Sequence, residues 1–156
     1  TEAKRLVELR GQETHLWKQL WGLGEFIAKR VAKRPDIDEV TLGEHDQRLM
    51  DSFVSVGKEV QSSIQEGEAA GALKVVSEFI RDDVSAHYLA TDGKRLGGED
   101  AAACYVVWSV GLGILKLIAP VIPNVAEEFY QLYYRDQEEA ASIHSVTWPE
   151  PFSSLD

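Results

Sequence analysis

The strongest constraint on the fold is one long apolar segment, AAACYVVWSVGLGILKLIA, at residues 101–119. It carries no charge from Ala101 to Leu115, and Lys116 then interrupts it. A helix that is apolar on every side must be surrounded by other helices or by lipid. A membrane-spanning helix needs about 20 such residues, and the charge-free run is shorter. The segment therefore favours the central helix of a bundle over a membrane span.

Two prolines follow at once, in APVIPNVAEEFYQLYY at residues 119–134. Ala119 precedes a proline, which disfavours helical backbone, so the apolar helix should end near there. Pro123 suits the first turn of a new helix, because proline has no N–H to leave unpaired. Glu127 and Glu128 lie early in that helix, where the helix dipole favours acids. The pattern predicts a helix, a corner and a second, shorter helix.

The rest of the chain shows helical periodicity and no internal repeat. Beyond the corner, SIHSVTWPEP at residues 142–151 is typical of an extended strap, with Trp148 as a plug on the bundle surface. We therefore expect an all-α fold: an antiparallel bundle of four long helices plus a shorter fifth helix and an extended C-terminal strap. This would be a single domain over residues 1–156, with helices at about 13–34, 43–66, 69–91, 99–118 and 123–135.

Length and cysteine content limit the number of domains and the cellular compartment that we expect. A chain of 156 residues fits one domain. The single cysteine, Cys104, excludes a disulfide framework and favours a reducing compartment such as the cytoplasm, and Cys104 itself reads as a small core residue. No signal-peptide pattern opens the chain. The first residue is Thr1 rather than Met, so we expect a piece of a longer protein.

The charge is unevenly distributed. The net charge of −10 argues against a nucleic-acid partner, but residues 1–34 hold eight Lys and Arg against four Glu, a local +4. The remaining 122 residues carry −14. The run KRVAKR at 29–34 places four cations at a helix C-terminus, where they suit the helix dipole or, equally, contact phosphate. Lys94 and Arg95, in the expected loop after the third helix, are a weaker candidate.

No catalytic or metal-binding motif stands out. The four histidines include no HExxH or Glu-x-x-His pattern, which leaves a zinc or di-iron site without support. Asp83 and His87 are four residues apart, a spacing that favours a structural pair. The two GLG triplets, at 22–24 and 111–113, do not extend to GxGxxG, so close helix packing explains them better than phosphate binding. From its residues the chain is a non-catalytic bundle with one basic end, no metal and no cofactor of its own.

Three motifs occur in order: LWKQLWGLGEF (16–26), FIRDDVSAHYLATDGKRL (79–96), and LKLIAPVIPNVAEEFYQLYY with SIHSVTWPEP (115–134 and 142–151). Together they resemble the anticodon-binding domain of class I aminoacyl-tRNA synthetases of the valine, isoleucine and leucine group. The last motif is the most specific, because the proline corner, acid pair and strap occur at the family's spacing. The resemblance covers about residues 13–151, and the Asp-Val-Ser-Ala-His-Tyr and Lys-Arg-Leu spacing is most like the valine enzyme in its archaeal form.

This resemblance implies a parent enzyme that joins an amino acid to its tRNA with ATP and Mg²⁺. The present domain would grip the anticodon stem-loop beside the catalytic domain of the same chain, with no membrane partner. Signatures of the HIGH and KMSKS type do not occur here, so the domain would bind without catalysing. Cations hold the phosphates while splayed bases are read. On charge and placement, the candidate tRNA-binding residues are Lys18, Lys29, Arg30, Lys33, Arg34, Lys94 and Arg95.

One departure from the family pattern concerns the first motif. Relatives usually carry Asn and Arg where this chain has Gly22 and Glu25, which removes a cation from the standard contact set. Two alternatives remain open: a domain of the isoleucine or leucine enzyme, and a helical protein-interaction scaffold without catalysis. A metal-dependent bundle enzyme is a distant third.

Overall fold

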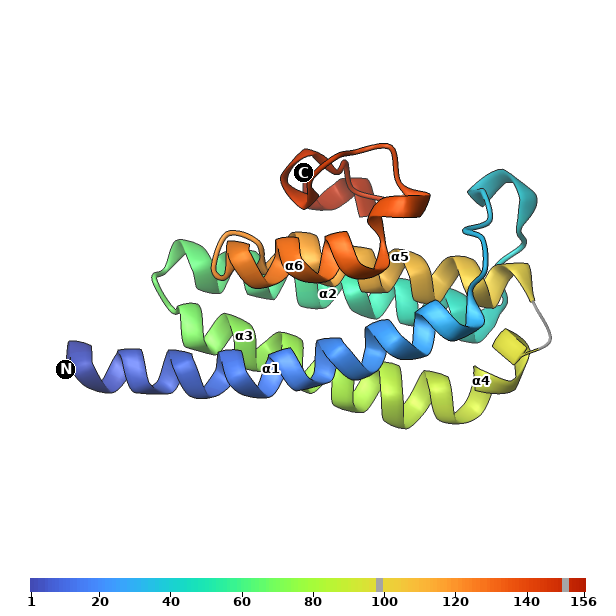
Figure 1. The fold of residues 1–156 in the computed structure, drawn as a ribbon. Coiled ribbons are helices and arrows are strands. Elements are labelled where there is room, and N and C mark those ends of the chain that lie inside the picture. The colour runs from blue at the N-terminus through green and yellow to red at the C-terminus, as the bar shows by residue number, and fades with distance from the viewer. Residues whose placement is uncertain (98–99, 150–151) are drawn as a thin grey trace.

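The computed structural model describes residues 1–97, 100–149 and 152–156. Within these residues it is helical and contains no strand, and consecutive long helices run in opposite directions (Figure 1). The helices are α1 (Glu2–Arg30), α2 (Glu44–Gln65), α3 (Ala69–Phe79), α4 (Ala90–Gly97), α5 (Ala101–Ile118) and α6 (Pro123–Tyr133). A π-helical segment, Ile80–Leu89, joins α3 and α4 into one continuous rod. The predicted all-α bundle of four long helices plus a shorter fifth is therefore confirmed.

The centre of the bundle is α5. It packs against α1, α2, α4 and α6, and its residues from Ala102 to Leu115 are all buried. By length and composition α5 could cross a membrane, with a mean hydropathy of 1.8, but 89% of that stretch is buried inside the fold. The other helices thus supply the apolar surroundings that a helix of this composition requires.

The corner after α5 has the geometry that the prolines predict. The helix ends at Ile118, and α6 begins at Pro123, which occupies its first turn. The acid pair then has a role that the helix dipole alone did not suggest. The carboxylate of Glu127 accepts hydrogen bonds from Ser142 Oγ at 2.6 Å and from the backbone N–H of Ile143 at 3.2 Å. Glu127 therefore anchors the start of the C-terminal strap to α6.

The strap contains one short 3₁₀ turn, Ile143–Ser145, and a second, Phe152–Leu155, follows it. The ring of Phe152 is fully buried, with its centroid 4.4 Å from that of Phe53 on α2. Trp148 is only half-buried, 6.4 Å from Phe53. Trp148 therefore packs on the bundle surface as predicted, while Phe152, which was not predicted, is the more deeply buried of the two. The last two residues of the predicted strap, 150 and 151, lie outside the described residues.

The first helix differs from its expected bounds at both ends. It begins at Glu2, where Thr1 Oγ1 accepts a hydrogen bond from the N–H of Lys4 at 3.3 Å. Residues 2–8 are exposed and so add nothing to a buried stripe, which is why periodicity predicts a later start. At the other end Val31 takes an extended conformation, with its side chain buried. Lys33 and Arg34 therefore lie in a loop rather than on the helix.

The rod formed by α3, the π-helical segment and α4 ends later than predicted, and α5 begins close to its predicted start. Lys94 and Arg95, expected in a loop, lie in the last turns of α4. The expected start at 99 falls outside the described residues. In the structure α5 starts at Ala101, and Asp100 caps it by accepting a hydrogen bond from the N–H of Ala103 at 3.0 Å.

Candidate nucleic-acid interface

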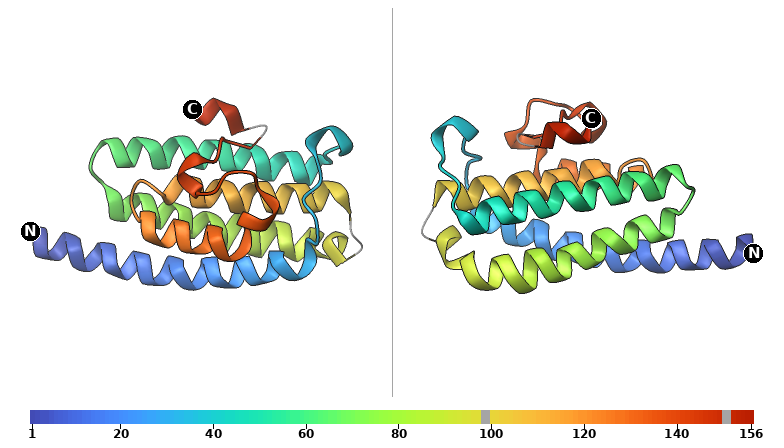
Figure 2. Two further views of the ribbon diagram at one scale, coloured as in Figure 1. Left: turned by 45° about the horizontal axis from the view of Figure 1, so that its top comes forward. Right: turned by 180° about the vertical axis from the view of Figure 1, so that it is seen from behind.

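One end of the bundle gathers most of the predicted cations. The C-terminal ends of α1 and α4 lie side by side there, next to the starts of α2 and α5 (Figures 1 and 2). Four exposed side chains from these two segments define what we call the cationic pole: Lys29, Arg30, Lys33 and Lys94. Helix C-termini carry partial negative charge, so cations at these ends also stabilise the two helices.

The side chains of the cationic pole are available to a partner. Within the described residues Lys29, Lys33 and Lys94 make no ion pair with a carboxylate at up to 4.0 Å. The guanidinium of Arg30 lies 3.7 Å from the ring centre of Phe26 and donates to the carbonyl oxygen of that residue at 3.4 Å. Stacking on a ring leaves most guanidinium N–H groups free to donate outward.

Arg34, unlike the side chains of the cationic pole, is engaged in an ion pair within the fold. Its Nη1 is 2.8 and 2.9 Å from the two carboxylate oxygens of Glu138. Glu138 also accepts from the indole N–H of Trp108 at 3.3 Å, and its side chain is only 9% exposed. Arg34 thus ties the loop after α1 to the segment after α6, and contact with phosphate would compete with that ion pair.

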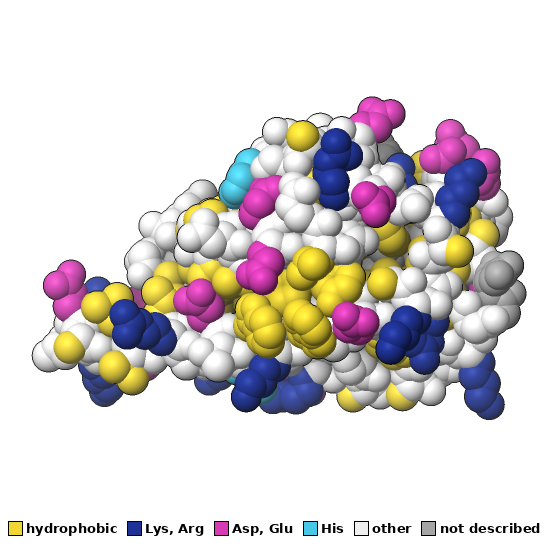
Figure 3. All heavy atoms as spheres, viewed as in Figure 1, with side chains coloured by type: hydrophobic (Ala, Val, Ile, Leu, Met, Phe, Trp, Pro, Cys, Tyr) yellow, Lys and Arg dark blue, Asp and Glu magenta, His cyan; other side chains and the backbone are white. Residues whose placement is uncertain are grey.

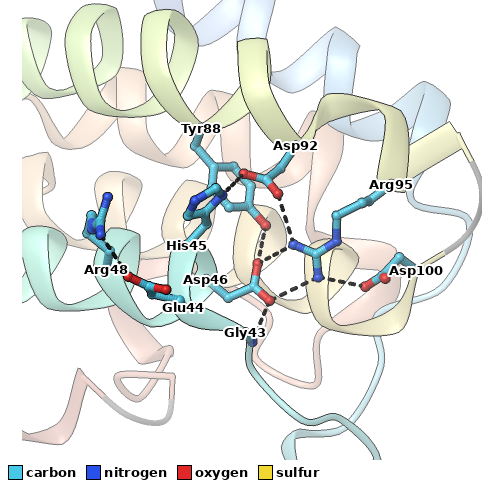
Figure 4. A network of polar contacts seen from close by, with 9 residues as sticks. All are labelled: Gly43, Glu44, His45, Asp46, Arg48, Tyr88, Asp92, Arg95 and Asp100. Carbon is cyan, nitrogen blue, oxygen red and sulfur yellow. Dashed lines mark hydrogen bonds and ion pairs between the residues drawn. The ribbon is translucent and has the colours of Figure 1, made fainter.

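Arg95 is still more strongly engaged, as Figure 4 shows. Its two terminal nitrogens lie 2.8 and 2.9 Å from the two oxygens of Asp46, a bidentate pair. The same guanidinium reaches Asp100 at 3.0 Å and Asp92 at 3.3 Å. Three carboxylates from α2, α4 and the start of α5 therefore surround one cation, which leaves it little positive charge to offer a phosphate.

The partner carboxylate, Asp46, is fully buried. Burial by itself would raise the pKa of Asp46, but the hydrogen bonds from Arg95, Tyr88 and the N–H of Gly43 outweigh burial and hold its pKa below the ordinary value. The hydrogen bond to Asp46 likewise raises the pKa of Arg95. Both groups stay charged, and they join α2 to α4 beneath the cationic pole.

Lys18 is not part of the cationic pole. It lies roughly 16 Å back along α1 from Lys29 at the rise of an α-helix. There it lines a groove of about 330 Å³ between α1 and the π-helical segment, together with Gly22, Phe26 and Arg81. Arg81 was not among the predicted residues, because two aspartates follow it in the sequence and its charge did not stand out. Its Nε donates to Asp82 at 2.8 Å.

Acids also reach the cationic pole. Asp36, Asp38 and Glu39 are exposed on the loop that follows Lys33 and Arg34, and Ile37–Glu39 forms a 3₁₀ turn there. Figure 3 shows both signs of charge at this end of the molecule. A polyanion that approached Lys33 would meet these carboxylates as well.

The remaining titratable side chains named from the sequence lie apart from the cationic pole. No group of three His, Cys, Asp or Glu side chains among them is placed to hold a metal ion. Asp83 and His87 line a small recess of about 60 Å³ with His45 and Tyr88. Cys104 is buried in α5.

The fold and site define the class as an all-helical domain with exposed cations gathered at one end. A family model described as the anticodon-binding domain of tRNA ligase matches residues 46–156, which is more than half of the chain. The chain therefore belongs to that family. The matched residues include Lys94 and Arg95, whereas α1 with its cations precedes them.

Curated relatives extend the similarity toward the N-terminus. The chain is 33% identical to an isoleucine–tRNA ligase of Pyrococcus abyssi over 118 residues, which is 72% of this chain and 11% of the ligase. It is 27% identical to a valine–tRNA ligase of Rickettsia canadensis over 146 residues, 83% of this chain and 18% of the ligase. It is 30% identical to a valine–tRNA ligase of Methanopyrus kandleri over 143 residues, 85% of this chain and 15% of the ligase. The chain thus spans less than a fifth of the length of these relatives.

Proposed function

We propose that this chain recognises the anticodon stem-loop of a tRNA as one domain of a class I aminoacyl-tRNA ligase. The observation that carries the proposal is the cationic pole, which combines exposed Lys29, Arg30 and Lys33 at and after the end of α1 with exposed Lys94 near the end of α4, in a member of the anticodon-binding family. The joining of amino acid to tRNA, with ATP and Mg²⁺, would take place in the catalytic domain of the same longer chain, in the cytoplasm.

The cationic pole suits the phosphates of a stem-loop better than its bases. Lysine and arginine at exposed positions neutralise phosphates and gain affinity from released counterions. The base contacts that specify a sequence come from stacking and edge hydrogen bonds. Arg34 and Arg95 then act on the RNA indirectly, since their ion pairs hold the loop after α1 and the end of α4 in place. Lys18 is a separate candidate contact in its groove.

We propose valine as the amino acid of the parent ligase, and isoleucine is the competing assignment. The motif from Asp83 to Tyr88 with Lys94, Arg95 and Leu96 supports valine by resemblance. The two valine ligases align with 83% and 85% of the chain, against 72% for the isoleucine ligase, which has the higher identity. A comparison of valine and isoleucine tRNA transcripts, with their anticodons exchanged, tests this choice: binding should follow the valine anticodon.

The test of the general proposal is a titration of the protein with an anticodon stem-loop hairpin at two salt concentrations. With about four phosphate contacts we expect log affinity to fall against log salt with a slope near −3. Arg30→Glu should weaken binding at least tenfold and leave the melting temperature unchanged, because the side chain is exposed. Lys58→Glu, a charge reversal at another exposed position, on α2, is the control and should change binding little. Absent or salt-insensitive binding would favour the helical scaffold instead.

A further inference from the structure

One face of α1 points away from the bundle and carries a straight row of side chains. The opposite face of this helix packs on the core through Leu16, Leu20 and Ile27. Residues three or four apart are neighbours along one face of a helix, and this spacing gives one row from Lys4 to Lys29. We call six exposed members of that row the outer ridge: Lys4, Gly11, His15, Lys18, Gly22 and Lys29.

The outer ridge is cationic, and its charges are free to meet a partner. Lys4, Lys18 and Lys29 are exposed, and among the described residues none of the three is ion-paired with a carboxylate. Figure 3 shows Lys and Arg side chains spaced along the lower edge of the molecule, where α1 lies. The acidic side chains that are visible in that view lie above this edge.

The acids of α1 lie mostly away from the row. Within the row, all of which the structure describes, the one acid is Glu25, and its carboxylate accepts a hydrogen bond from the hydroxyl of Tyr133 on α6 at 2.9 Å. By helical spacing Glu8 lies to one side of the row, and Glu2 and Glu13 lie on other faces of the helix. An anionic partner along the row therefore meets three lysines and little opposing charge.

Two glycines separate the lysines of the outer ridge, and the packing of the fold does not require them. A Cβ atom added at Gly11 or at Gly22 would meet nothing within 4 Å. Glycine is less favourable than alanine in the interior of a helix, so the fold gains nothing from either residue. Glycine also lets a ligand approach the backbone closely. The bare surface between the lysines therefore fits a partner that lies directly against the helix.

The length and the chemistry of the outer ridge fit the backbone of a nucleic acid. At the rise of an α-helix Lys4 lies about 37 Å from Lys29, close to the length of one duplex turn, which is roughly 34 Å in DNA. Protein partners depend on aromatic and arginine anchors, whereas Val7 is the one large hydrophobic side chain in the row. Widely spaced lysines without such an anchor suit a partner whose negative charge repeats along its length, as phosphates do.

We propose that the outer ridge contacts the sugar–phosphate backbone of the tRNA stem beyond the anticodon loop, so that the RNA runs from the cationic pole back along α1. The proposal rests on the proposed function, which brings the anticodon loop to the cationic pole. Lys29 belongs to both surfaces and joins them. Lys4 and Gly11, about 37 and 27 Å back along the helix from Lys29, are new members of the contact surface. Neither lies in the part of the chain that the family model matches, residues 46–156.

The test compares two RNAs binding to the complete ligase chain: a complete tRNA transcript, and an anticodon hairpin with a five-base-pair stem, about 17 Å long. Lys4→Gln should weaken binding of the complete tRNA at least threefold and reduce its salt slope by about 0.9. Arg5→Gln is the matched control, because it removes the same charge from an exposed side chain about 100° around the helix, and it should change neither value. The hairpin does not reach Lys4 from the cationic pole and should bind equally to all three proteins.

Gly11→Leu provides a second readout, in which binding and stability should separate. Leucine favours the helix, so the melting temperature should not fall. The added side chain should nevertheless hold the RNA away from the helix and weaken binding of the complete tRNA at least threefold. Gly11→Ala adds a single methyl group and should weaken binding less. A purely structural role for Gly11 would instead lower the melting temperature together with the affinity, and that result would overturn the proposal.

The opposing results separate this proposal from the proposed function. Binding of the complete tRNA that does not respond to Lys4→Gln, or does not respond to Gly11→Leu, would overturn the proposal. An equal loss of affinity with Arg5→Gln would also overturn it, because the effect would then be one of overall charge. If the wild-type chain binds the hairpin while the variants leave binding of the complete tRNA unchanged, only the outer ridge fails. If the wild-type chain binds neither RNA, the proposed function fails and the outer ridge fails with it.

Discussion

Arg95 Nη2 lies 2.9 Å from Oδ2 of Asp46, a carboxylate that solvent does not reach. The pair joins the third residue of α2 to the last turns of α4, and through Asp100 it also contacts the cap of α5. Three helices thus meet at one ion pair beneath the cationic pole. The pair places Lys94, the neighbour of Arg95, at the surface.

Loss of the buried charge should destabilise the fold. Asp46→Asn leaves Arg95 without its bidentate partner, and breaking a buried pair from one side costs about 3 kcal/mol or more. Urea unfolding followed by circular dichroism measures the difference. Glu44→Gln is the matched control two residues away, because its pair with Arg48 is solvent-exposed, and it should leave the midpoint unchanged. Equal effects of the two substitutions would contradict the role assigned to Asp46.

Acid should destabilise the fold by protonating the carboxylate of Asp46. The pKa of Asp46 in the folded protein lies below the ordinary value of 3.8, so its stabilisation is fully present above that value and is lost as pH falls below it. Unfolding free energies between about pH 4 and pH 2 should therefore decline more steeply for the wild-type chain than for Asp46→Asn. Some decline should persist in the variant, because hydrogen bonds to the Ala103 N–H and to Arg95 also lower the pKa of Asp100. Parallel curves would show that Asp46 titrates normally.

The free energy of unfolding should fall more when Phe152 is replaced by alanine than when Trp148 is. Phe152 is fully buried against Phe53, so Phe152→Ala should cost about 3–5 kcal/mol. Trp148 is half-buried, and Trp148→Ala should cost about 1–2 kcal/mol, in proportion to the area it covers. Denaturant titration of both variants gives the order, and the reverse order would mean that the strap packs differently.

Two glycines in helices should respond in opposite directions to alanine. At Gly111 in α5 an added methyl group would meet the hydroxyl of Tyr134 and the side chain of Ile27, so Gly111→Ala should destabilise by about 1–3 kcal/mol. At Gly22 in α1 nothing lies within 4 Å of the added atom, and Gly22→Ala should stabilise by about 0.5–1 kcal/mol. Melting temperatures of the pair report both signs. A loss of stability at Gly22 would indicate that the groove beside it is closed.

The acids beside the cationic pole should weaken RNA binding. Neutralising Asp36, Asp38 and Glu39 together, with Asn, Asn and Gln, removes three repulsive charges next to Lys33. We expect affinity for an anticodon stem-loop to rise several-fold at about 0.05 M salt and the gain to shrink near 0.5 M, as the screening length falls. Fluorescence anisotropy with the hairpin measures this. An unchanged affinity at low salt would place the RNA away from this loop.

Much of the fold could be predicted because the decisive signals are local. The apolar run and the two prolines set α5, the corner and α6 from a stretch of adjacent residues. The start of α1 could not be seen, since its first turns are exposed and carry no buried stripe. The end of α1 was misplaced because the burial of Val31, which takes the chain out of the helix, is a tertiary effect.

The sequence allowed us to predict which cations lie near helix ends, but not which of them form ion pairs in the fold. Lys29 and Arg30 lie in the last turn of α1, Lys33 just after it and Lys94 in the last turn of α4, and their role in binding stays a prediction. The ion pairs of Arg34 and Arg95 join residues far apart in the chain, Glu138 and Asp46, and no spacing in the sequence reveals them. The acids that bind these two arginines look, in the sequence, like ordinary surface charge.

Phe152 lies about a hundred residues after Phe53 in the chain, and this separation has a consequence for folding during synthesis. Phe152 and Leu155 pack on Phe53 and Gly57 of α2, which leave the ribosome much earlier. Phe79 of α3 and Gly113 of α5 also contact Phe53, so the C-terminal turn adds the last part of its cover, and packing around Phe53 is complete only when that turn is in place.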